Sequence, residues 1–256
     1  MYLCRRAPAP LTIDGDLTKP AWREAERSPR FTDMVTGAPA PFGTHAALLW
    51  DAENLYAAFW VEEPFVEARL TERDSLIFLE NDVELFIDGG DAYYELEVNA
   101  LGTVYEVFFV WRDAYEKFRR DFPLERALSF GGDFDRTGEY FWRGTHPRGL
   151  RWAFRDWDLP GLRAGVRVQG RINDATHIDQ GWTVELALPW AGMTHLAGGR
   201  SLPPRDGDEW RFFLGRFQKM VMSGVEVQPH PAWVWTPHGV YDTHQPSRWT
   251  PVRFVE

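Results

Sequence analysis

Cysteine, basic charge and long apolar runs are all scarce in this chain of 256 residues. Cys4 is the only cysteine, so no intrachain disulfide can form. The net charge is −10, whereas a protein that binds nucleic acid needs a basic surface to replace counterions. No run of 18 apolar residues is present, and an anionic lipid surface would repel an acidic chain. We therefore expect no nucleic-acid partner and no membrane partner.

The start of the sequence also lacks an apolar stretch. The segment MYLCRRAPAP carries two arginines with no hydrophobic run behind them, which is unlike a secretory signal. The sequence as it stands predicts a cytoplasmic protein. A misassigned start would make a secreted or periplasmic location the alternative.

Aromatic residues are abundant, at 15% of the chain with 13 tryptophans, and aromatic side chains favour strands. Apolar residues recur mainly with a period of two, which indicates β-strands. Helical periodicity is confined to two short segments, Lys19–Glu26 and Pro189–Met193. The predicted strands are His45–Asp51, Asn54–Glu62, Asp82–Asp88, Tyr93–Asn99, Thr103–Trp111, Val166–Asn173, Trp182–Leu188, Glu209–Phe217, Ala232–Thr236 and Trp249–Val255. Many short strands with Gly and Pro turns predict an all-β fold, an antiparallel β-sandwich of jelly-roll type, in one domain spanning 1–256.

Alternation assigns each predicted strand an apolar face and a second face. The residues expected in the core between two sheets are Val83, Leu85, Ile87, Leu96, Val98, Trp182, Leu186 and Trp210. The opposite face of the hairpin Asp82–Asn99 collects Glu84, Glu95, Glu97 and Asn99 together with aromatic rings. Like charges this close disfavour each other, so an arginine, a bound cation or open water must compensate. A solvated outer face and a ligand site both remain open readings of this pattern.

One stretch, about 113–153, interrupts the strand rhythm and is rich in both charged and aromatic residues. Disordered linkers lack aromatic residues, so we expect this insertion to be ordered and to fold against the polar face. Alternatively, it could bury its rings against a second copy of the chain, which would make the protein a homo-oligomer.

Seven short motifs, spread from Leu11 to Trp249, resemble the family 9 carbohydrate-binding modules, a group related to DOMON domains. In chain order they are LTIDGDLTKPAW, LLWDAENLYAAFWV, ENDVELFIDGG, YYELEVNALGTV, GWTVELALPW, DEWRFFLGR and WVWTPHGVYDTHQPSRW. The insertion is not covered by the resemblance. The chain is most similar to a divergent branch found as whole bacterial proteins.

The resemblance implies a jelly-roll sandwich, often with structural calcium, that binds the ends of sugar chains such as cellulose or xylan without cleaving them. Glu84 matches the family's hydroxyl-binding Glu, and Trp235 matches one of its two stacking tryptophans. Phe78 stands at the position of the other tryptophan, while Glu95 and Glu97 stand where the family has a Gln and an Arg. The predicted ligand site is Phe78, Glu84, Glu95, Glu97, Asn99, Arg216 and Trp235. Arg216 belongs to this site only if its strand bulges near Gly215, because alternation otherwise directs it toward the core.

Two other functions compete with non-catalytic carbohydrate binding. A glycoside-cleaving enzyme would use two carboxylates about 5–10 Å apart, which Glu84 could form with Glu95 or Glu97. A haem-binding or redox domain would need axial ligands, for which Met193, His195, Met220 and Met222 are available. No haem or other organic cofactor is expected. Asp14 and Asp16, with Asp82, could hold calcium, although the TIDGD segment is equally consistent with an Asx turn.

Overall fold

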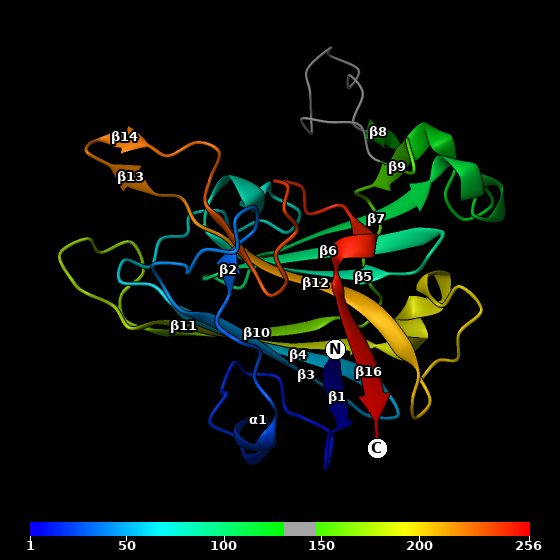
Figure 1. The fold of residues 1–256 in the computed structure, drawn as a ribbon, viewed down its shortest axis with the longest axis horizontal. Helices are drawn as coiled ribbons and strands as arrows, with labels where there is room; N and C mark the ends of the chain where they lie inside the picture. The colour runs from blue at the N-terminus through cyan, green and yellow to red at the C-terminus, as the bar shows by residue number, and fades with distance from the viewer. Residues whose placement is uncertain (131–146) are drawn as a thin grey trace.

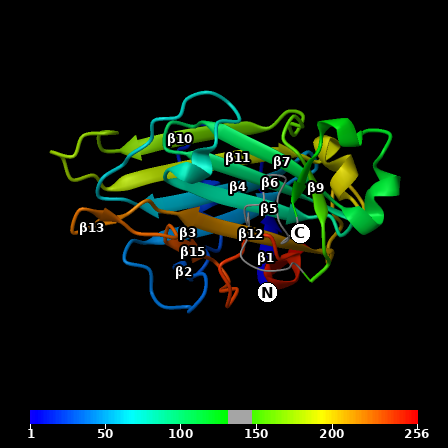
Figure 2. The ribbon, with the colours of Figure 1, turned by 90° about the horizontal axis from the view of Figure 1, so that it is seen from above.

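The computed structural model describes residues 1–130 and 147–256. It is a β-sandwich whose two layers belong to one curled sheet of fourteen strands (Figures 1 and 2). The first layer contains β3 (Thr44–Trp50), β4 (Asn54–Glu62), β10 (Arg163–Gln169) and β11 (Gly181–Pro189). The second contains β5 (Asp82–Asp88), β6 (Ala92–Asn99), β7 (Val104–Trp111) and β12 (Glu209–Phe217). The predicted all-β sandwich is confirmed.

Two strands at the ends of the chain join the layers. β1 (Tyr2–Arg6) pairs in parallel with both β3 and β16 (Thr250–Val255), and β16 continues the sheet to β12. The sheet is therefore mixed, whereas the sequence predicted an antiparallel one. The physical reason is that parallel and antiparallel strands can carry the same period-two pattern, so the pattern alone does not give the strand direction.

The buried apolar residues form three clusters, one between the layers and one on the outer face of each layer. The main cluster lies between the layers and includes all eight predicted core residues, among them Val83, Trp182 and Trp210. The second cluster lies on the outer face of the second layer, and the third lies under α1 (Pro20–Glu24) on the outer face of the first layer. The predicted helix Lys19–Glu26 contains α1, and the predicted Pro189–Met193 overlaps η4 (Trp190–Leu196).

The register of the central hairpin is the one that alternation predicted. Val83 pairs with Val98 and Leu85 with Leu96, and all four side chains are buried between the layers. Glu84 pairs with Glu97, and both are also buried, but on the opposite face. A slip of one residue would exchange these faces, so the apolar residues fix the position of every acidic one.

The insertion extends the second layer at its edge. β9 (Arg151–Phe154) pairs with β7, and β8 (Leu128–Phe130) pairs with β9. Phe122 is buried in the main cluster, and the Arg151 guanidinium lies 5.9 Å from the Tyr93 ring on the outer face of β6. The predictions that the insertion folds against the polar face, or joins two copies of the chain, also concern residues 131–146. These residues lie outside the described ones.

The remaining elements are short. They are β2 (Thr32–Asp33), β13 (Val221–Met222), β14 (Val225–Glu226), β15 (Ala232–Val234), η1 (Ile77–Leu79), η2 (Arg112–Lys117), η3 (Leu124–Arg126) and η5 (Pro246–Arg248). β15 pairs with β12 and with β2, and β13 and β14 form a separate hairpin. Across the described ranges, no helix has the length and apolar character needed to cross a membrane.

Candidate functional site

A cavity of about 370 Å³ lies on the outer face of the second layer. Its floor is formed by β5, β6, β7 and the end of β12, and its walls by η1 and the segments 226–230 and 241–244. This volume lies within the range of small-molecule sites. The lining residues are Phe78, Leu79, Glu84, Phe86, Glu95, Glu97, Tyr105, Phe109, Phe217, Glu226, Gln228, Pro229, His230, Tyr241, Thr243 and His244.

Strand pairing explains why these side chains meet. Glu84 of β5 is opposite Glu97 of β6, which in turn is opposite Tyr105 of β7. Cross-strand partners point to the same side of a sheet, so the three side chains form a row across the floor. Phe86 and Glu95 form the next pair of the same face.

Aromatic rings give the cavity apolar walls close to its acids. The Phe78 ring meets the Tyr105 ring edge-on at 5.7 Å, and the Phe86 ring lies 5.0 Å from the Phe213 ring. His244 is buried against the rings of Phe86 and Phe109, at 5.4 and 5.1 Å, and its Nε2 lies 3.7 Å from Glu95 Oε2. The cavity therefore combines flat apolar surface with charged hydrogen-bonding groups.

Burial controls the ionisation of the acids on the outer face of the second layer. It raises the pKa values of Asp82, Glu84 and Glu97 well above their usual range, and the charges of the neighbouring carboxylates raise them further. It also raises the pKa of Glu95 to about 7, an effect that the contact with Glu97 and the charges of Arg151 and Arg155 partly offset. The raised pKa values favour the protonated, neutral forms of these acids, because their surroundings solvate negative charge poorly.

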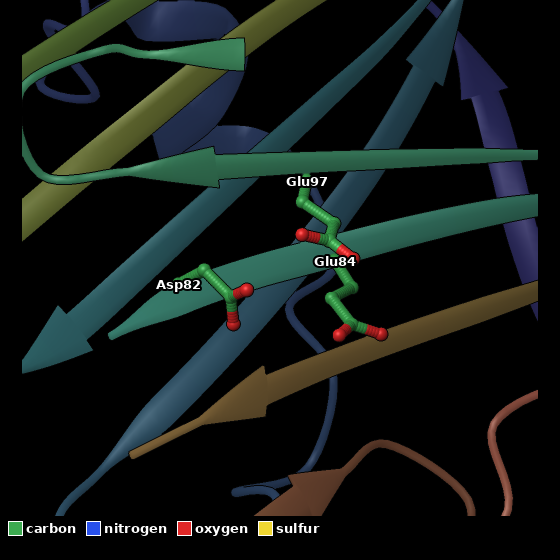
Figure 3. A group of neighbouring side chains, drawn as sticks. All are labelled: Asp82, Glu84 and Glu97. Carbon is green, nitrogen blue, oxygen red and sulfur yellow. The ribbon is translucent and has the colours of Figure 1, made fainter. Parts of the chain in front are cut away.

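Three of these carboxylates converge. Asp82 and Glu84 extend from β5 and Glu97 from β6, toward the same side of the sheet (Figure 3). One oxygen from each lies within 4.8 Å of the other two. Both oxygens of Asp82 and one each of Glu84 and Glu97 are buried without a hydrogen-bond partner among the described residues.

The structure brings together four of the seven residues in the predicted ligand site. Glu84, Glu95 and Glu97 lie on the cavity floor, and half-buried Phe78 lies at its wall. The sequence indicated this group in two ways. The three acids alternate onto one face of their strands, and Phe78 stands at the position of a stacking tryptophan in the family that the motifs resemble.

The other three residues are placed elsewhere. Asn99 is buried, donates to Leu70 O and Glu80 Oε1, and accepts from two backbone amides of its own turn. Arg216 faces the inside of the sandwich because β12 pairs continuously with β5 through Gly215, without the bulge that would redirect it. The Trp235 ring packs edge-on against Tyr2 at 4.8 Å and belongs to the margin of the main core.

The predicted calcium ligands do not come together either. Asp14 and Asp16 lie on the outer face of the first layer, where Lys19 and Arg167 already neutralise them. Asp14 Oδ1 accepts from Asp16 N, as in an Asx turn. Asp82 lies on the outer face of the second layer, so Asp14 and Asp16 do not fit a calcium site that includes it.

The candidate haem ligands are dispersed. Met193 is buried in the main core, His195 lies 5.0 Å from the Phe122 ring, and Met222 is exposed on β13. Within the described ranges, the cavity lining includes none of these three residues, nor does it include Met220.

Several residues that line the cavity were not predicted from the sequence. Tyr105 and Phe109 alternate along β7 with the same parity, so their face could have been assigned once β6 and β7 were paired. Gln228, His230 and Tyr241 come from loops, and the period-two pattern does not place loop residues.

Comparison with known proteins indicates a shared fold. No protein-family model matches the sequence, and no curated protein sequence matches it. A solved structure from Bacteroides uniformis ATCC 8492, provisionally described as a carbohydrate-binding protein, is similar with a TM-score of 0.58 at 14% identity. The match covers 99% of this chain and 98% of that one.

Two further similar structures are of a family 9 carbohydrate-binding module from Caldicellulosiruptor kristjanssonii. The complex with cellotriose gives a TM-score of 0.57 at 12% identity and covers 99% of this chain and 93% of that one. The complex with glucose gives 0.52 at 13% identity, with 99% and 95% covered. At these identities the likeness establishes the fold, in agreement with the family resemblance of the motifs.

Proposed function

We propose that this protein binds a carbohydrate, without cleaving it, in the cavity on the outer face of the second layer. The observation that carries the proposal is the lining of that cavity, where Glu84, Glu95 and Glu97 lie beside the rings of Phe78 and Tyr105. Carboxylates accept strong hydrogen bonds from hydroxyls, and aromatic faces supply apolar contact at little entropic cost. A sugar presents both kinds of surface.

The size of the cavity favours a short ligand. A volume of about 370 Å³ is near the lower end of the range for small-molecule sites. It suits one or two sugar rings better than the middle of a long chain, so we propose that the ligand is an oligosaccharide or the end of a glycan. The similar structures support this choice, because two of them are complexes of a module with glucose or cellotriose.

The proposal is tested by screening the purified chain against a glycan array. We expect binding to a small set of related oligosaccharides or glycan ends. A chain that binds no glycan on the array would contradict the proposal.

The non-catalytic part of the proposal has a separate test. The chain is incubated with aryl-glycosides of the sugars that bind, and release of the aryl group is followed. We expect no release above the background of the buffer. Release that disappears in the Glu84→Gln variant would instead support the glycoside-cleaving alternative.

A further inference from the structure

Asp82, Glu84 and Glu97, on the outer face of the second layer, differ from five other buried acids in the described parts of the chain. Glu63 accepts from Asn81 Nδ2 at 2.6 Å and from Trp182 Nε1 at 2.7 Å. Glu185 accepts from Lys19 Nζ at 2.6 Å and from Trp22 Nε1 at 2.7 Å. The remaining members of this paired group, Asp51, Glu106 and Asp179, also accept hydrogen bonds from nearby donors. This fold therefore normally supplies a donor for a carboxylate that it buries.

No basic or amide side chain among the described residues donates a hydrogen bond to Asp82, Glu84 or Glu97. Asp82 is fully buried, and Glu84 and Glu97 are 4% and 2% exposed. In the part of the chain that the structure describes, neither oxygen of Asp82 and only one oxygen at most of Glu84 and of Glu97 has a hydrogen-bond partner. No ion pair is formed by any of the three within residues 1–130 and 147–256. Burying three carboxylates without compensation is costly, because the protein replaces their hydration with nothing.

Two arginines on neighbouring segments do not provide that compensation. Arg216 is on β12, but it faces the opposite side of the sheet and contacts Glu63 Oε2 at 3.4 Å. Arg155 lies over the Tyr105 ring at 5.5 Å and donates to Asp74 O. Neither guanidinium forms an ion pair with the three carboxylates.

The geometry points to a hard divalent cation, of which Ca²⁺ is the representative, bound by Asp82, Glu84 and Glu97 on the outer face of the second layer. One oxygen of each residue lies within 4.8 Å of the other two, a separation that a single ion can bridge (Figure 3). All three ligands are oxygens, which suits Ca²⁺, Mg²⁺ or Mn²⁺ and disfavours softer metals. Glu84 and Glu97 also line the cavity, so water can complete the coordination from that side.

This metal site is distinct from the one predicted from the sequence and does not depend on the proposed sugar binding. It shares only Asp82 with the set of Asp14, Asp16 and Asp82. Asp14 and Asp16 are paired with Lys19 and Arg167, so they serve as matched controls. The metal alone is the probe.

Titration calorimetry with CaCl₂ tests the proposal after the purified chain has been treated with EDTA and dialysed. We expect binding to one site in the wild type, and an affinity reduced about tenfold or more by Asp82→Asn and by Glu84→Gln. Asp14→Asn should bind as the wild type does. Thermal unfolding followed by circular dichroism should show a higher Tm with CaCl₂ than with EDTA, because the ion binds only the folded state.

A crystal grown with MnCl₂ locates the ion without any variant, so the test holds even if the variants fold poorly. We expect an anomalous peak between the carboxylates of Asp82, Glu84 and Glu97. Absence of both binding heat and a Tm shift in the wild type would overturn the proposal. The proposal would also be overturned by an anomalous peak at another place or by loss of Ca²⁺ binding in Asp14→Asn. Unchanged Ca²⁺ affinity in both Asp82→Asn and Glu84→Gln would overturn it as well.

Discussion

Arg216 shows how strongly the surroundings of one residue determine its role. The guanidinium donates to Glu62 O at 2.8 Å and to Thr44 Oγ1 at 3.1 Å, and it lies over the Trp233 ring at 5.0 Å. Burial lowers its pKa to about 10, which leaves it charged at neutral pH. Arg216 therefore ties β12 to the first layer and compensates Glu63 inside the sandwich.

We predict that Arg216→Met destabilises the protein and leaves ligand affinity unchanged. Removing one member of a buried ion pair typically costs about 3–5 kcal/mol, because the remaining charge is poorly solvated. Urea unfolding measures the loss of stability, and calorimetry on the folded variant measures affinity. Arg211→Met, at an exposed position of the same strand, is the control and should change stability by about 0.5 kcal/mol or less. A large loss of ligand affinity in folded Arg216→Met would show that this residue belongs to the binding site after all.

The alternation of side chains along a strand made the face of some individual residues predictable. The alternation in Asp82–Asn99 placed Glu84, Glu95 and Glu97 on one face and Val83 on the other, as the structure has them. The same rule directed Arg216 inward, and it was included in the site only as an arginine that could compensate the clustered acids. Trp235 was assigned through its motif alone, and its contact with Tyr2 depends on β1, a strand that the sequence pattern did not reveal.

The loop before α1 shows how an element can be held by one side chain. Glu185 of β11 is fully buried and accepts from the backbone amides of Asp14 and Gly15 and from the side chains of Lys19 and Trp22. The motif LTIDGDLTKPAW therefore fixes this loop against the first layer. Close approach requires glycine at Gly165, where a Cβ would lie 2.6 Å from Gly15 N.

We predict that Glu185→Gln loosens this loop and costs about 3 kcal/mol or more of stability. The neutral amide loses the charge that pairs with Lys19, and its NH₂ group must face other donors. Hydrogen exchange should show faster exchange of the amides in segment 12–19, and urea unfolding should show the lost stability. Glu209→Gln, which alters an exposed pair with Arg253, should change stability by no more than about 0.5 kcal/mol. Equal effects of the two variants would contradict the assigned role of Glu185.

The strands of the sandwich were more predictable than the way they are assembled. Long alternating runs such as Asn54–Glu62 and Glu209–Phe217 have the bounds that the sequence indicated. The short strands β2, β8 and β9 were not predicted, because two to four residues carry too little pattern. Their positions depend on partners distant in the sequence, such as β15 for β2.

At the scale of the whole molecule, the curled sheet links both layers through β1 and β16. The main core draws residues from every part of the sandwich, including Phe122 of the insertion. The segments that form the cavity floor are the same strands that bury this core on their other face. Stability and the shape of the site are therefore coupled.

We predict that the chain unfolds as one domain. Because a single core joins both layers, differential scanning calorimetry should show one transition whose calorimetric and van't Hoff enthalpies agree. Two separate transitions would show that the layers or the insertion unfold independently. Such a result would contradict the assignment of 1–256 to one domain.

The central claim is that a carbohydrate binds in the cavity on the outer face of the second layer. The most direct measurement is calorimetry with a glycan selected on the array, comparing wild type with Phe78→Ala and Trp235→Ala. Phe78 lies at the cavity wall and Trp235 packs outside it, so one variant removes a ring from the site and the other removes a ring from elsewhere. We predict that Phe78→Ala weakens binding about tenfold or more and that Trp235→Ala leaves it unchanged. Unchanged affinity in Phe78→Ala together with a loss in Trp235→Ala would contradict this account and place the ligand elsewhere.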